Sequence, residues 1–120
     1  MTLETKLIRA VRAALTVPLT PAPARSGAPS AVYRCHPGRS DGSLATADIT
    51  VRVFHHSPEE ALRELSRLRK TLLTDGDSGV VGKGADTLIL CETDNGGLSG
   101  AVSGTGLYVV QAGFTAQGRV

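Results

Sequence analysis

The sequence contains no tryptophan, and its aromatic side chains are few: Tyr33, Phe54, Tyr108 and Phe114. Each lies in a segment that we expect to be a strand, so the chain lacks an exposed aromatic platform on which nucleic acid bases would stack. The net charge is only +2, with basic and acidic residues interleaved, which argues against a strong electrostatic hold on nucleic acid. The core must be mostly aliphatic, and 120 residues suffice for a single domain, 1–120.

Cysteine is equally scarce, with Cys35 and Cys91 far apart in two expected strands. So sparse a pair, in a chain without a secretory signal, indicates reduced thiols in an intracellular protein; a disulfide between facing strands is the alternative. Charged residues interrupt 1–15, so this segment has no apolar signal-peptide core, and no other segment approaches membrane-spanning length. We therefore expect a soluble protein with no membrane partner.

The clearest local signal lies in residues 57–76. Ser57 is a favourable N-cap, and Pro58 fits the first helical position, where a backbone N–H is not needed. Glu60 follows the cap by three residues and can return a hydrogen bond to the Ser57 backbone, which completes a capping box. Gly76 is placed to end the helix. The segment therefore predicts a helix with a defined start and a defined end.

Both helices expected from the sequence are amphipathic. The apolar stripe of 57–76 consists of Ala61, Leu65, Leu68 and Leu72. Its opposite, charged face consists of Glu59, Glu60, Arg63, Glu64, Arg67 and Lys70. Residues 3–15 repeat the helical spacing after a Thr2 N-cap. We expect each helix to lie on a core and to show its charged face to water.

Four segments have the composition of strands. They are 31–36, 45–54, 87–92 and 106–115. The second alternates most clearly, with Ile49, Val51 and Val53 on one side. The third, TLILCE, is apolar enough to predict a buried strand, whereas Val80 and Val81 predict at most a brief one.

The connecting segments are rich in proline and glycine. Residues 16–30 predict an extended, Pro-rich connector, and the segment PGRSDGSL predicts a wide hairpin loop between two antiparallel strands. In 94–105, DNGG could close a tight hairpin with pairing from Leu98. We favour the other interpretation, a long Gly-rich loop with pairing only from Leu107.

These elements follow one another in the order α-β-β-α-β-β. Short connections between successive strands favour antiparallel pairing, so the predicted fold class is α+β. We expect an antiparallel four-stranded sheet with two helices packed on it.

Several residue sets resemble chemical sites, but none has the required spacing. The candidate metal ligands are Cys35, His36, His55, His56 and Cys91. Cys35 and His36 should lie by the hairpin loop, and the His55–His56 pair past the far end of the next strand, so they cannot share an ion. The segment 79–84 lacks both the spacing and the Ser or Thr of a phosphate-binding loop. We expect no catalytic residues, no metal and no cofactor.

With these elements placed, the layout resembles the tail terminator proteins of long-tailed bacteriophages and related prophages. The similarity covers nearly the whole chain, and the segments that carry it are TLETKLIRAVRAAL, the Pro-rich connector, AVYRC, ADITVRVF, SPEEALRELSRLRKTLL and GLYVVQAGFTA. The most characteristic piece is a strand that ends in a short polar break and turns straight back in a capped helix, ADITVRVFHHSPEEALRELSRLRKTL. The Gly-rich segment 94–106 and the connector length are where the chain differs.

The resemblance implies a structural virion component without catalytic residues. Such a protein forms a ring, as a homohexamer, that stops tail-tube polymerisation and joins the tail to the head. Its expected partners are the tail tube protein, a head-completion protein, and double-stranded DNA that passes through the lumen without specific binding. It is expected at the head-proximal end of the tail, after assembly in the host cytoplasm.

The expected interface residues lie in polar segments that a ring neighbour would order. They are Arg39, Asp41, Leu98 and Val102. Arg39 and Asp41 are placed at the tip of the first hairpin, and the other two in the Gly-rich loop. The alternatives to a terminator are a head-completion (stopper) protein, a small soluble binding module, and an enzyme that uses Cys91 or the histidine pair.

Overall fold

The computed structural model describes residues 2–23, 27–102 and 105–119, with the side chains of 95–99 and 102 left out. Its elements in chain order are α1 (Leu3–Ala14), β1 (Leu19–Pro21), β2 (Ser30–Asp41), β3 (Leu44–His55), α2 (Pro58–Leu72), β4 (Ser78–Val81), the short 3-10 helix η1 (Gly84–Asp86), β5 (Leu88–Val102) and β6 (Leu107–Arg119). The expected α+β class is confirmed.

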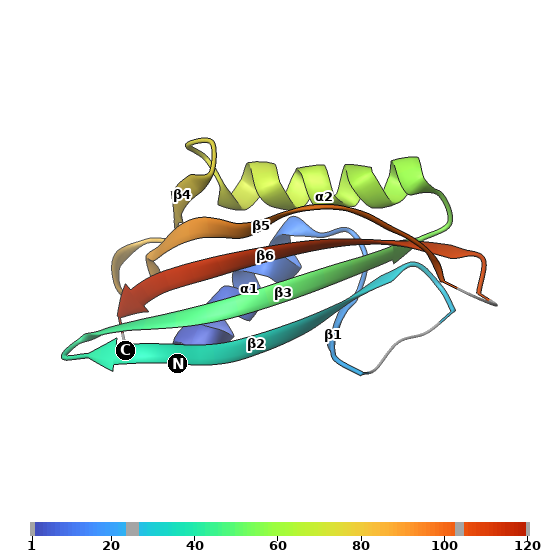
Figure 1. Cartoon of the computed structure of the whole chain (residues 1–120). Helices are drawn as coiled ribbons and strands as arrows, with labels where there is room; N and C mark the ends of the chain where they lie inside the picture. The colour runs from blue at the N-terminus through green and yellow to red at the C-terminus, as the bar shows by residue number, and fades with distance from the viewer. Residues whose placement is uncertain (1, 24–26, 103–104, 120) are drawn as a thin grey trace.

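The sheet has six strands in the order β1-β2-β3-β6-β5-β4. β1 runs parallel to β2, and every other neighbouring pair is antiparallel. The expected four-stranded sheet and α-β-β-α-β-β order are therefore wrong, because β1 and β4 add a strand at each edge. Figure 1 shows the long strands β2, β3, β5 and β6 side by side, with both helices on the same face.

The two helix starts confirm the expected N-caps. Thr2 Oγ1 accepts a hydrogen bond from the Thr5 backbone N–H at 3.2 Å, and Ser57 Oγ accepts one from the Glu60 N–H at 3.2 Å. The Glu60 carboxylate instead lies 3.1 Å from His55 Nε2. α2 ends at Leu72, before Gly76, so the expected role of Gly76 as the helix stop is wrong.

The core fills the space between the helices and one face of the sheet. β3 turns Ile49, Val51 and Val53 inward, as the alternation predicted, and all three are fully buried. The helices contribute the expected apolar stripes. The largest fully buried side chains of this core are Phe114, Leu7, Ile49, Leu68, Leu72, Leu88, Leu90, Val11, Val51, Val53 and Val110. The apolar pattern thus fixes which face of each element is dry.

The β2–β3 hairpin is longer and tighter than the sequence predicted. Asp41 pairs with Leu44, so two residues form the turn in place of a wide loop, and Gly42 supplies its positive φ of 61°. A register shift between Pro37 and Ser40 absorbs the Pro-Gly dipeptide as a bulge. The hairpin therefore extends to the far end of the molecule, where its turn protrudes (Figure 1).

β5 continues through the segment expected to be a loop. Its backbone pairs with β6 from Leu88 to Val102, with Leu98 opposite Val110 and Val102 opposite Leu107. Both the long Gly-rich loop 94–105 and a DNGG hairpin turn are therefore wrong. Register shifts let the strand accommodate its polar and glycine residues without losing the pairing.

The Pro-rich connector contributes a strand of its own. β1 pairs with Ala31–Tyr33 of β2, and hydrogen bonds extend the pairing from Ala31 N–H to Pro18 O at 2.7 Å and from Ala22 N–H to Tyr33 O at 3.0 Å. The connector 16–30 is thus partly a sheet edge, and residues 24–26 lie outside the described part of the structure.

Glu64 differs from its expected place on the water-facing side of α2. The residue is 5% exposed, and its carboxylate accepts hydrogen bonds from Thr16 N–H at 2.8 Å and Thr16 Oγ1 at 2.7 Å. Arg67 Nε stands 3.7 Å from the same carboxylate. Thr16 lies just after the end of α1, and the Glu64 carboxylate accepts hydrogen bonds from its backbone and side-chain donors, which would otherwise lack partners.

We expect Glu64→Ala to destabilise the domain by about 1–3 kcal/mol, because it leaves the two Thr16 donors unpaired in a partly buried site. Urea denaturation of the wild type and of Glu64→Ala measures the difference in unfolding free energy. Arg63→Ala, at an exposed position on the same helix, is the matched control and should be nearly neutral. Equal unfolding free energies for Glu64→Ala and Arg63→Ala would contradict the assigned role.

Candidate assembly surface

One face of the sheet carries no helix in the part of the chain that the structure describes. Because side chains alternate along a strand, the residues of β3 between the buried ones point to this second face, and Thr50 and Arg52 are exposed there. We call it the open face. A small apolar cluster of Val32, Phe54 and Leu107 is buried on it, with Val109 packed against them. A sheet that buries one face against helices and leaves the other to solvent has a second surface available for a partner.

Three exposed apolar side chains follow one another across the open face. Leu44 is 45% exposed, Ile89 53% and Val80 58%. Val80 on β4 pairs directly with Ile89 on β5, and Ile89 shares a hollow of about 320 Å³ with Leu44. We call these three residues the open-face strip. Neighbouring apolar side chains left in water mark an interaction surface more often than scattered ones do.

The expectation that 87–92 is a buried strand is wrong for one of its two faces. Leu88 and Leu90 are buried under the helices, whereas Ile89 and Cys91 point to the open face and are exposed. A continuous apolar run does not show which face of the strand the helices will leave exposed. The position of Ile89 follows only from the placement of both helices on the opposite side.

The hairpin tip continues this surface at the end of the molecule. Arg39 and Asp41 are exposed there, as expected, but they lie in β2 and not in a loop. Asp41 pairs with Leu44, and all three residues line one shallow hollow of about 130 Å³. Two opposite charges therefore flank an exposed leucine. The other expected interface residues, Leu98 and Val102, have side chains outside the described part of the structure.

A second hollow on the open face is polar and has a volume of about 540 Å³. Its lining includes Arg34, His36, Arg52, Gln111 and the connector residues Ala22 and Pro23. Arg52 Nε donates to Gln111 Oε1 at 2.9 Å, and Gln111 Nε2 donates to Asp94 Oδ2 at 2.9 Å. This relay across three strands fixes the Arg52 guanidinium at the sheet surface.

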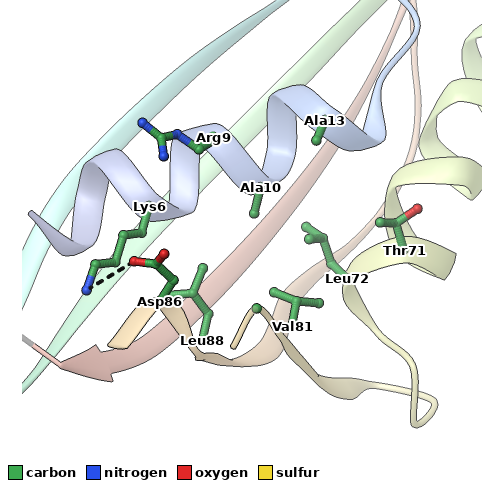
Figure 2. A pocket seen from close by; sticks show the side chains of 10 residues that line it. Lys6, Arg9, Ala10, Ala13, Thr71, Leu72, Val81, Asp86 and Leu88 are labelled. Atoms are coloured by element: carbon green, nitrogen blue, oxygen red, sulfur yellow. Dashed lines mark ion pairs between the residues drawn. The ribbon is translucent and has the colours of Figure 1, made fainter. Parts of the chain in front are cut away.

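A groove opens between the helices on the other side of the molecule (Figure 2). It has a volume of about 310 Å³, and its lining residues are Lys6, Arg9, Ala10, Ala13, Thr71, Leu72, Val81, Gly82, Asp86 and Leu88. We call it the interhelix groove. Most of the lining is apolar, and the charged residues stand at the rim. The groove thus offers an apolar receptor on the helical layer.

The outermost strands of the sheet are short. β1 has three residues and β4 has four. Each covers only part of a longer neighbour, since β1 pairs with 31–33 of β2 and β4 with 88–91 of β5. Pro21 lies in β1, and Pro37 lies where β2 extends beyond β1, so each removes a backbone donor.

The residues tested as chemical sites have structural explanations. His55 Nε2 lies 3.1 Å from Glu60, and its Nδ1 accepts a hydrogen bond from the His56 N–H at 2.9 Å. Within the described ranges, no group of three or more His, Cys, Asp or Glu residues is placed to hold a metal ion. Gly79 packs so closely on α2 that a Cβ would collide with the Leu72 carbonyl, so this glycine serves packing.

The two cysteines are free thiols on well-separated strands. Burial, followed by the charges of Glu4 and Asp48, raises the pKa of the Cys35 thiol to about 11. The reactive thiolate is therefore rare at neutral pH, which makes Cys35 a poor nucleophile. Cys91 is exposed on β5, and its partner in register is Thr115.

No protein-family model matches this sequence, and no curated protein matches it. The described helices include none that is long and apolar enough to cross a membrane. The surfaces of this chain and the layout of its elements are therefore the features from which a function can be proposed.

Proposed function

We propose that this protein is the subunit of a ring-forming tail terminator, which stops tail-tube polymerisation and joins the tail to the head. The observation that carries the proposal is the open-face strip, Leu44, Val80 and Ile89, which the described parts of the chain leave exposed. A neighbouring copy in a ring would cover these side chains. Burial of apolar surface favours association by about 25 cal/mol per Å² before the entropy cost of binding.

The layout of the elements also supports this function. A capped N-terminal helix leads through a Pro-rich connector to a long hairpin, and β3 passes through a short polar break directly into α2. The closing strand β6 occupies the middle of the sheet between β3 and β5. The chain order of the long elements, α1, β2, β3, α2, β5 and β6, is the order on which the resemblance to tail terminators depends, whereas β1 and β4 are added at the edges and β5 is longer than expected.

A ring requires two different surfaces on each subunit. In a heterologous contact, one patch meets a distinct patch on the next copy, and the ring closes when the rotation between copies divides a full turn. The open face and the helical layer are two such surfaces, on opposite sides of the sheet. In a hexamer, the tail tube protein would bind one rim and a head-completion protein the other, with DNA passing through the lumen.

Two other functions have specific support. A head-completion protein is usually richer in strands than a terminator. The sheet of this chain has six strands and not the expected four, so its strand content is closer to that of a head-completion protein. A soluble binding module is favoured by the polar hollow of about 540 Å³ beside Arg34 and Arg52. Binding to the ends of tail tubes separates the three, since only a terminator both binds there and stops growth.

Ile89→Asp tests the assembly surface. We expect it to weaken self-association by at least about tenfold while leaving the melting temperature almost unchanged, because the charge replaces an exposed side chain on the open face. Sedimentation velocity over a range of concentrations, with and without tail tubes, measures the assembly. Leu62→Asp is the matched control for folding, since Leu62 is 42% exposed on α2 and the same change there should also leave the melting temperature almost unchanged. Ring formation by Ile89→Asp at wild-type concentrations would contradict the assigned surface.

A further inference from the structure

The interhelix groove has room for a side chain that the described residues do not supply. Ala10 and Ala13 of α1 face it, and neither reaches far into the space between the helices (Figure 2). Figure 2 shows Leu72, Val81 and Leu88 forming the rest of its apolar wall. A cavity of about 150 Å³ already holds a molecule the size of benzene. The groove, at about 310 Å³, is therefore large enough to receive a leucine side chain.

The rim of the groove carries one cation and one anion that are available to a partner. Arg9 is exposed and has no hydrogen bond or ion pair with the residues that the structure describes. Asp86 is 65% exposed and lies 4.0 Å from Lys6. Lys6 itself is occupied, because its Nζ donates to the Ala85 carbonyl at 2.6 Å. The rim thus presents Arg9 on the α1 side and Asp86 on the η1 side.

The hairpin tip carries the complementary set. Leu44 is exposed, Asp41 lies directly opposite it in register, and Arg39 is two residues before Asp41 on the same strand. A leucine flanked by an anion and a cation thus protrudes from one surface of the molecule. An apolar hole flanked by a cation and an anion lies on another. Opposite charges in matching positions fix the register of a contact and disfavour wrong partners.

We infer that the hairpin tip of one copy docks into the interhelix groove of a second copy of this chain. Leu44 enters the groove, Asp41 pairs with Arg9, and Arg39 pairs with Asp86. This contact places the open face of one subunit against the helical layer of the next, which also covers the neighbouring Ile89. Because tip and groove are different surfaces, the contact repeats from copy to copy and can close a ring. The inference rests on the proposed function and names the contact by which the ring forms.

A charge-swap experiment tests the contact. Arg39→Glu and Asp86→Lys are made singly and together, and assembly is measured by sedimentation velocity of the full chain. We expect each single reversal to raise the concentration needed for assembly by about tenfold, and the double variant to recover most of that loss. Arg63→Glu, at an exposed position on α2, controls for the effect of a charge reversal on folding and should melt like the wild type.

Ala13→Leu provides a second, independent variant, since it fills the groove from an exposed helical position and keeps a good helix former. It should block assembly with an unchanged melting temperature. Rings formed by Ala13→Leu and by both single reversals at wild-type concentrations would overturn this contact and leave the proposed function standing. A wild-type chain that stays monomeric at high concentration and on tail tubes would overturn both.

Discussion

Leu65→Asp is expected to unfold the domain. Leu65 is 4% exposed and belongs to the stripe of α2 that packs on the sheet. Truncating a buried leucine to alanine already costs about 2–5 kcal/mol, and an aspartate adds the cost of placing a carboxylate among apolar groups. The total loss, at least about 4 kcal/mol, is comparable to the whole stability of a small domain. Circular dichroism and urea denaturation measure the outcome.

Leu62→Asp serves as the control for this prediction. It makes the same chemical change one turn away on α2, at a side chain that is 42% exposed. Since that side chain already contacts water, the variant should melt close to the wild type. A soluble Leu65→Asp protein with a cooperative transition near that of Leu62→Asp would show that the helix packs by a different face.

Arg69→Ala is expected to cost about 2 kcal/mol of unfolding free energy. Arg69 Nε donates to Glu92 Oε2 at 2.6 Å and its Nη2 donates to Oε1 at 3.1 Å, a bidentate pair that ties α2 to β5. The Glu92 hydrogen bond raises the pKa of Arg69. The Glu92 side chain is only 8% exposed, so losing the guanidinium leaves a nearly buried carboxylate unpaired. The cost stays below that of a fully buried pair because 40% of Arg69 is exposed.

A double-mutant cycle separates the pair from its surroundings. Arg69→Met with Glu92→Met removes both charges and keeps side chains of similar length, so it should be less destabilising than Arg69→Ala alone. Thermal or urea denaturation of the wild type, Arg69→Met, Glu92→Met and the double variant gives the interaction energy, and Arg69→Ala is measured beside them. If Arg69→Ala and the double variant lose the same stability, Glu92 is not left unpaired and the assignment is wrong.

Local signals at helix starts were enough to predict both helices. Ser57 and Thr2 accept the backbone hydrogen bonds that their sequence positions predicted, because capping depends only on residues within one turn. The role of Glu64 was missed for the opposite reason. Its partner, Thr16, lies 48 residues away, so a helical wheel places Glu64 with the charged side chains that face water.

Strand lengths were less predictable than helix starts. The segments DNGG and PGRSDGSL have the composition of turns, yet half of their residues take part in strand pairing in the structure. Long-range pairing along two long ladders, β2–β3 and β5–β6, outweighed local turn preference, and bulges absorbed the mismatch. β1 was missed because a three-residue strand with a proline carries too little pattern to distinguish it from extended connector.

The assembly surface was predicted only in part. Arg39 and Asp41 were expected at an exposed tip, and their position there follows from a turn signal in their own segment. Ile89 and Val80 were not expected on a surface, since an apolar side chain in a strand predicts burial unless the cover of that face is known. The groove between α1 and α2 depends on the packing of the two helices, which no local pattern specifies.

The mass of the protein in solution tests the central claim most directly. Native mass spectrometry of the wild-type chain, at increasing concentration and after addition of tail tubes, reports whether a closed assembly forms. We expect a discrete species of six chains at high concentration or on the tubes, and loss of that species in Ile89→Asp. A single-chain mass under every one of these conditions would contradict an open face that is covered by another copy.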